Sequence, residues 1–81
     1  MYTADDFNTE NAPKEMVQYI IDNIENFDER YGLAHDFIGK YRCPLIMAGR
    51  NLYFEISDRK DEWCRHNGLD PDDYDIEEIF G

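Results

Sequence analysis

The sequence predicts a small α+β fold with amphipathic N-terminal helices, a two-stranded antiparallel hairpin and one or two short C-terminal helices. Three observations support this prediction. The length of 81 residues suits a single domain, 1–81. Apolar residues make up 42% of the chain, which is enough to form a core. Their spacing is helical in the first half and alternates around a glycine turn in the middle.

The first helix is predicted from Pro13 to Phe27, and a second from Asp28 to about Tyr41. Proline suits the first turn of a helix because its missing N–H would have no partner there. Apolar residues of the first helix then recur at i, i+3, i+4 and i+7, so they share one face. That face consists of Met16, Val17, Ile20, Ile21, Ile24 and Phe27.

A hairpin is predicted around Gly49-Arg50-Asn51, which separates two apolar runs. Glycine at the first position of a two-residue loop suits a type II′ turn. The runs are 45–48 and 52–56, and their alternation defines one core-facing side. That side consists of Leu45, Met47, Leu52, Phe54 and Ile56.

The last third of the chain predicts one or two short helices. Ser57-Asp58 has the composition of an N-cap, and the helix that follows would carry Trp63 and end at Asn67-Gly68. Asp70-Pro71 then repeats the starting signal of a helix. The expected core consists of Met16, Val17, Ile20, Ile21, Ile24, Phe27, Phe37, Leu45, Phe54, Ile56 and Trp63.

Negative charge concentrates at both ends of the chain. Nineteen acidic and eight basic side chains give a net charge of −11. Residues 1–29 hold eight acids and one base, residues 30–69 five acids and seven bases, and residues 70–81 six acids and no base. Such a surface repels phosphate backbones and attracts basic partners at long range.

These charges predict a non-enzymatic protein-interaction module that binds a basic, nucleic-acid-handling protein. Carboxylates displayed on a rigid scaffold can imitate the charges of a nucleic-acid backbone, and small acidic inhibitors from phages and mobile elements have a similar size and charge. The acidity could instead serve solubility alone. The candidate partner-binding residues are Asp22, Glu25, Asp28, Glu29, Asp70, Asp72, Asp73, Asp75, Glu77 and Glu78.

The alternative function is a small nucleic-acid-binding transcriptional regulator that uses the basic middle segment. A helix-helix-hairpin order would suit a winged DNA-binding domain. The net charge of −11 makes direct nucleic-acid binding unfavourable, because affinity for DNA comes largely from neutralising phosphates. The residues of this alternative are Arg42, Arg50, Arg59 and Lys60.

The sequence predicts no enzyme, cofactor or metal site. Zinc sites usually have ligands in closely spaced pairs such as C-x₂-C or H-x₃-H, whereas Cys64 and His66 are separated by one residue and His35 and Cys43 by seven. A calcium loop counted from Asp70 would need glycine at its sixth position and glutamate at its twelfth, and it has neither. Without a membrane span or a secretion signal, we expect a cytoplasmic location, reduced thiols and no membrane partner.

The segment 72–80 ends in Glu77-Glu78-Ile79-Phe80 and resembles the acidic, Ile- and Phe-tipped tail of bacterial single-stranded-DNA-binding proteins. In that family the tail recruits repair enzymes, and its last residue is the Phe; here Gly81 follows. The resemblance implies a free tail that binds a partner. The alternative, which we favour, is that Ile76, Ile79 and Phe80 pack onto the domain.

Overall fold

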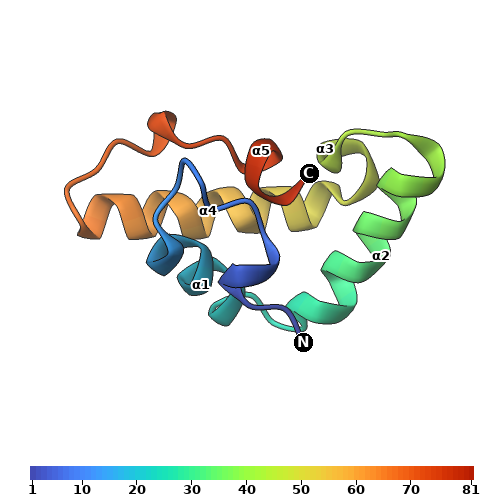
Figure 1. Ribbon diagram of the computed structural model, residues 1–81, viewed down its shortest axis with the longest axis horizontal. Coiled ribbons are helices and arrows are strands. Elements are labelled where there is room, and N and C mark those ends of the chain that lie inside the picture. The colour runs from blue at the N-terminus through green and yellow to red at the C-terminus, as the bar shows by residue number, and fades with distance from the viewer.

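All 81 residues are described by a computed structural model, and every regular element in it is a helix (Figure 1). The longest helix, α4, runs across the molecule in Figure 1 with α1 below it and the C-terminal segment above it, and the N-terminal segment crosses α4 to contact the C-terminal segment, where Phe7 packs against Phe80. Helix α2 rises at one end, and α3 connects it to α4. In chain order the elements are η1 (Ala4–Asp6), α1 (Lys14–Asp22), α2 (Phe27–Tyr41), α3 (Leu45–Ala48), α4 (Arg50–His66), η2 (Pro71–Asp73) and α5 (Ile76–Phe80).

The α+β prediction is wrong, because the predicted hairpin is helical. Its first strand is α3, and its second strand is the beginning of α4. Gly49, which was expected in a type II′ turn, instead precedes α4 and accepts a hydrogen bond from the Tyr53 N–H at 2.7 Å. The predicted helix start at Ser57-Asp58 lies inside α4.

The error has a simple geometric cause. Leu52 and Ile56 are four residues apart, and this spacing places both side chains on one face of a strand or of a helix. The two periods differ at Met47 and Phe54, which alternation placed on the core-facing side but which are 73% and 47% exposed. The buried series continues at the same spacing through Lys60 and Cys64, so a helix can place one continuous stripe against α1.

The other helices agree more closely with the sequence. Helix α2 lies where the second helix was predicted, and α4 ends next to Asn67-Gly68, where Gly68 adopts a left-handed conformation. The first helix is shorter than predicted, because α1 ends at Asp22 and Asn26 turns the chain in a left-handed conformation before Phe27. None of the helices combines the length and the hydropathy needed to cross a bilayer.

Sixteen buried residues form one contiguous core. Eight of the eleven predicted core residues are among them. The exceptions are Phe37 and Phe54, which are exposed, and Trp63, which is half-buried. Alternation misplaced Phe54, and Phe37 lies in the second half of α2, where it lines an open groove beside α3.

An aromatic cluster around Tyr31 joins the two ends of the chain to α2. The Tyr31 ring stacks on Phe27 at 5.2 Å between centroids and meets Tyr2 and Phe7 edge-on, each at 5.1 Å. Phe80 packs against Phe7 at 4.7 Å, so α5 belongs to the same cluster. Such aromatic pairs each contribute about 0.5–1.5 kcal/mol beyond the area they bury.

The C-terminal segment is docked. Ile76, Ile79 and Phe80 are buried, and the Tyr31 hydroxyl donates a hydrogen bond of 2.6 Å to the Phe80 carbonyl oxygen. Lys60 holds the preceding loop by donating to the Tyr74 carbonyl oxygen at 2.9 Å. The side chains that would recognise a partner in a free tail are therefore part of the core, as the favoured alternative predicted.

Burial gives Tyr31 a measurable influence on the pH dependence of stability. Loss of hydration raises the pKa of Tyr31 from 10.0 to about 12. Between these two values the unfolded chain releases the phenolic proton while the folded chain keeps it, so stability falls as the pH rises.

We therefore predict that the free energy of unfolding falls between pH 10 and pH 12, and that Tyr31→Phe makes this fall less steep. The same variant should lose about 1–3 kcal/mol near neutral pH, because the Phe80 carbonyl loses its donor. Urea titrations of the wild type and the variant across this range measure both effects. Tyr41→Phe, at an exposed tyrosine, is the control, and an equally steep fall in Tyr31→Phe would refute the assignment.

Two glycines weaken α2 without a packing reason. Gly32 and Gly39 both lie inside the helix, and a Cβ atom at either position would meet nothing within 4 Å. We predict that Gly32→Ala and Gly39→Ala each stabilise the protein by up to about 1 kcal/mol, the difference in helix propensity. Thermal and urea unfolding should both show the gain; a loss of stability would mean that α2 needs flexibility at these positions.

Candidate functional site

The ten carboxylates predicted to bind a partner are all exposed, and they form two separate groups. Asp22 ends α1, Glu25 lies in the loop that follows, and Asp28 and Glu29 begin α2. The other six lie in the segment 70–78, which contains η2 and most of α5. In Figure 1 the α1–α2 junction lies below α4, and the segment 70–78 above it. The structure therefore presents two acidic surfaces rather than one row.

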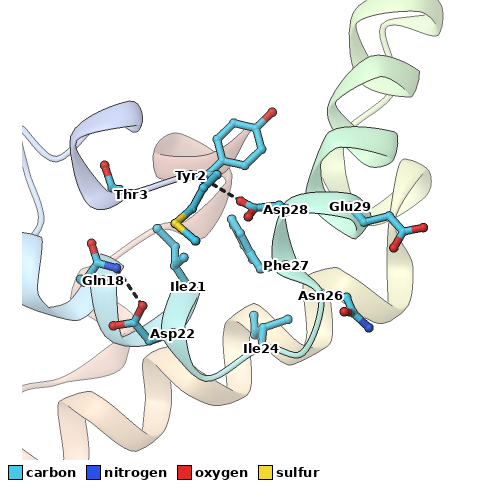
Figure 2. Close-up of a pocket in the computed structure, with 11 residues that line it drawn as sticks. Tyr2, Thr3, Gln18, Ile21, Asp22, Ile24, Asn26, Phe27, Asp28 and Glu29 are labelled. Carbon is cyan, nitrogen blue, oxygen red and sulfur yellow. Dashed lines mark hydrogen bonds between the residues drawn. The ribbon is translucent and has the colours of Figure 1, made fainter.

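A pocket of about 360 Å³ adjoins the first group, between the N-terminal segment, the end of α1 and the start of α2 (Figure 2). Asp28 points into the pocket toward Tyr2, whereas Glu29 points away from it. Asp22 lies at the opposite rim beside Gln18. The floor is apolar and is formed by the side chains of Ile21, Ile24 and Phe27.

Hydrogen bonds fix the acidic rim of this pocket. The Asp28 carboxylate accepts from the Tyr2 backbone N–H, at 2.5 Å. Asp22 accepts from the Gln18 amide nitrogen at 2.9 Å, and the Gln18 amide oxygen accepts from the Ala4 N–H at 3.1 Å. These bonds fasten the N-terminal segment to α1 and α2, so the rim carboxylates are held in place before a partner arrives.

The second group is partly occupied by structural roles. Asp70 caps η2 and Asp75 caps α5, because each carboxylate accepts the backbone N–H two residues later, at 3.0 and 2.9 Å. Glu78 accepts from the Asn11 side chain at 3.1 Å. The carboxylates with no such bond belong to Asp72, Asp73 and Glu77.

None of the ten carboxylates takes part in an ion pair. The three ion pairs of the chain use other acids: Asp5, Glu55 and Glu62. The negative charge of both groups is thus open to a lysine or arginine from another molecule. One exposed ion pair contributes at most about 1 kcal/mol, so strong binding through these surfaces requires several contacts at once.

Two of the four cations proposed for nucleic-acid binding have internal partners. Arg59 pairs with Glu62 at 3.1 Å, and Lys60, only 9% exposed, donates to the Tyr74 carbonyl. The hairpin that could have served as a wing is helical. The cations that remain free of such contacts are Arg42 and Arg50.

The cysteines and histidines do not come together. Cys64 is fully buried, with its Sγ atom 3.8 Å from the Met16 Sδ atom, and this burial raises the pKa of the Cys64 thiol. A thiol that stays protonated is a poor nucleophile and a poor metal ligand. Cys43 is half-buried in the α2–α3 connection. No group of three His, Cys, Asp or Glu side chains has an arrangement that could hold a metal ion.

Sequence reasoning missed an apolar surface formed by α2, α3 and the start of α4. Leu33 and Met47 are 68% and 73% exposed, and Phe37 and Phe54, both predicted in the core, lie on the same part of the molecule. A usable signal was present in α2. The buried residues of α2 are Phe27, Tyr31 and Ala34. Leu33 and Phe37 lie one turn apart beside this buried face, so they form a second apolar pair on the helix surface.

No protein-family model matches this chain, and neither does any curated protein or solved structure.

Proposed function

We propose that the protein is a non-enzymatic interaction module that binds a basic, nucleic-acid-handling protein through its acidic surfaces. The carboxylates would occupy the positions that backbone phosphates take in the partner's binding groove. The supporting observation is that ten exposed carboxylates, in two groups, have no cation bound to them within the chain. With a net charge of −11, they also attract a basic partner from a distance.

The pocket beside the first group suits the side chains of such a partner. Lysine and arginine combine an aliphatic stem with a charged head. The apolar floor with Phe27 can cover the stem, and the rim carboxylates of Asp22 and Asp28 can contact the head. Because these carboxylates are already held by hydrogen bonds, binding immobilises little further side-chain freedom.

The proposed compartment is the cytoplasm. Both cysteines are free thiols, and one of them is only half-buried. Free thiols persist where glutathione and thioredoxin keep them reduced. Nucleic-acid-handling partners are also present there.

We predict that neutralising the pocket surface weakens partner binding. The variant Asp22→Asn/Asp28→Asn/Glu29→Gln changes the net charge from −11 to about −8. Basic proteins captured from a bacterial lysate should bind this variant at least about tenfold more weakly than the wild type. Duplex DNA should displace them, and binding should weaken as salt shortens the Debye length from ~10 Å at ~0.1 M to ~3 Å at ~1 M.

A second triple variant controls for net charge. Glu10→Gln/Glu15→Gln/Asp36→Asn removes the same number of exposed charges outside both groups. It should bind nearly as well as the wild type. Equal weakening by both triple variants would show that only the overall charge matters, and a partner that survives high salt and excess DNA would contradict the proposal.

A further inference from the structure

An open apolar groove lies between α2 and the α3–α4 junction. Its volume is about 620 Å³. Leu33 and Phe37 form the α2 side, and Met47 the α3 side. Their exposed fractions are 68%, 39% and 73%. Contiguous exposed apolar surfaces of this kind often mark interaction sites, whereas single exposed apolar residues do not.

The floor of the groove is set by a close approach between α2 and the start of α4. A Cβ atom added at Gly49 would lie 3.0 Å from the Ala34 Cβ. The close approach therefore depends on glycine at position 49 and on the small side chain of alanine at position 34. The larger side chains Leu33 and Met47 therefore stand on either side of a floor made of small residues. The groove is a consequence of tight packing beneath it.

Two arginines and no acid line the groove, although acids outnumber bases 19 to 8 in the chain. Arg30 pairs with Glu55, whereas Arg50 forms no ion pair. Lys40 and Arg42, which lie at the end of α2 and do not line the groove, form no ion pair either. Two of these unpaired cations lie against exposed aromatic rings instead: Lys40 Nζ is 5.3 Å from the centre of the Tyr41 ring, and the Arg50 guanidinium carbon is 5.8 Å from that of Phe54. The groove thus has an apolar centre and a positively charged rim.

We infer that this groove binds an acidic amphipathic helix of a partner protein. The apolar face of such a helix would fill the groove, and its carboxylates would pair with the rim cations. The surrounding elements are all helices and offer no strand edge, so an extended segment could not add main-chain hydrogen bonds. A helix of about 14 residues, about 21 Å long, is therefore a suitable probe of the groove.

The charges disfavour a second copy of this chain as the occupant. A two-fold dimer would place the same surface against itself. The rim arginines, Arg30 and Arg50, would then face an identical positive rim, and two chains of net charge −11 would be brought together. An acidic helix from a different protein meets neither local repulsion at the rim nor a requirement for matching symmetry.

Peptide selection tests this inference. Random peptides of about 14 residues, displayed on phage, are selected on the full-length protein and then synthesised with a fluorescent label for anisotropy. Selected peptides should carry Asp or Glu together with Leu, Ile or Phe at helical spacing, and twins with lysine at each acid should not bind. Basic selected peptides, or a selection that enriches none, would overturn the inference.

Substitutions then locate the binding surface. Leu33→Ser and Arg50→Glu should each weaken binding of the selected peptide about tenfold, whereas Leu69→Ser and Arg65→Glu, at exposed positions outside the groove, should not. Arg50→Glu is informative because an acid in the first turn of α4 favours the helix, so the unfolding midpoint should not fall. Equal binding to all four variants would refute the groove as the site.

Two further measurements address other occupants. Sedimentation that shows a dimer dispersed by Met47→Ser would assign the groove to a second copy. Tighter binding of a labelled single-stranded oligonucleotide than of the selected peptide, abolished by Arg50→Glu, would assign it to nucleic acid. Either result overturns the inference.

The triple amide variant of the acidic pocket should bind the selected peptide as the wild type does. Failure of the groove inference and failure of the proposed function are therefore distinguishable.

Discussion

Burial of Tyr31 is the interaction on which the arrangement of the chain depends. Its ring meets residues from the N-terminal segment and from its own helix, and its hydroxyl hydrogen bonds to the main chain of α5. A buried phenol requires a partner for its hydroxyl, and the Phe80 carbonyl provides one. Both ends of an 81-residue chain are thereby attached to α2, which lets short segments such as η1 and α5 add to a small core.

The same arrangement separates the charged surfaces. Fastening the N-terminal segment to the start of α2 creates the acidic pocket, and docking α5 places the segment 70–78 on the other side of α4. The α3–α4 junction covers α2 only in part, and the apolar groove lies between these elements. An acidic surface and a basic, apolar surface at different places suit a protein that contacts two partners, or two parts of one partner.

The exposure of the predicted carboxylates followed from the sequence, because ionised side chains remain hydrated unless they are paired. Their division into two groups did not follow, because it depends on how α4 lies between distant segments. The groove was missed for a related reason. Leu33, Phe37 and Phe54 are apolar, and a sequence pattern cannot distinguish an apolar residue that meets the core from one that lies beyond its edge. Phe37 and Phe54, the two residues of the predicted core that are exposed, are on this surface.

By itself the sequence determined the features that depend on neighbouring residues. These are the extent of α2, the end of α4 before Gly68, the Asp70 cap of η2 and the overall negative charge. Tertiary structure alone decided that residues 45–56 are helical, because Leu52 and Ile56 share a face in a strand and in a helix alike. The helix prevails because Lys60 and Cys64 extend the same stripe against α1, a stabilisation that only the assembled core provides.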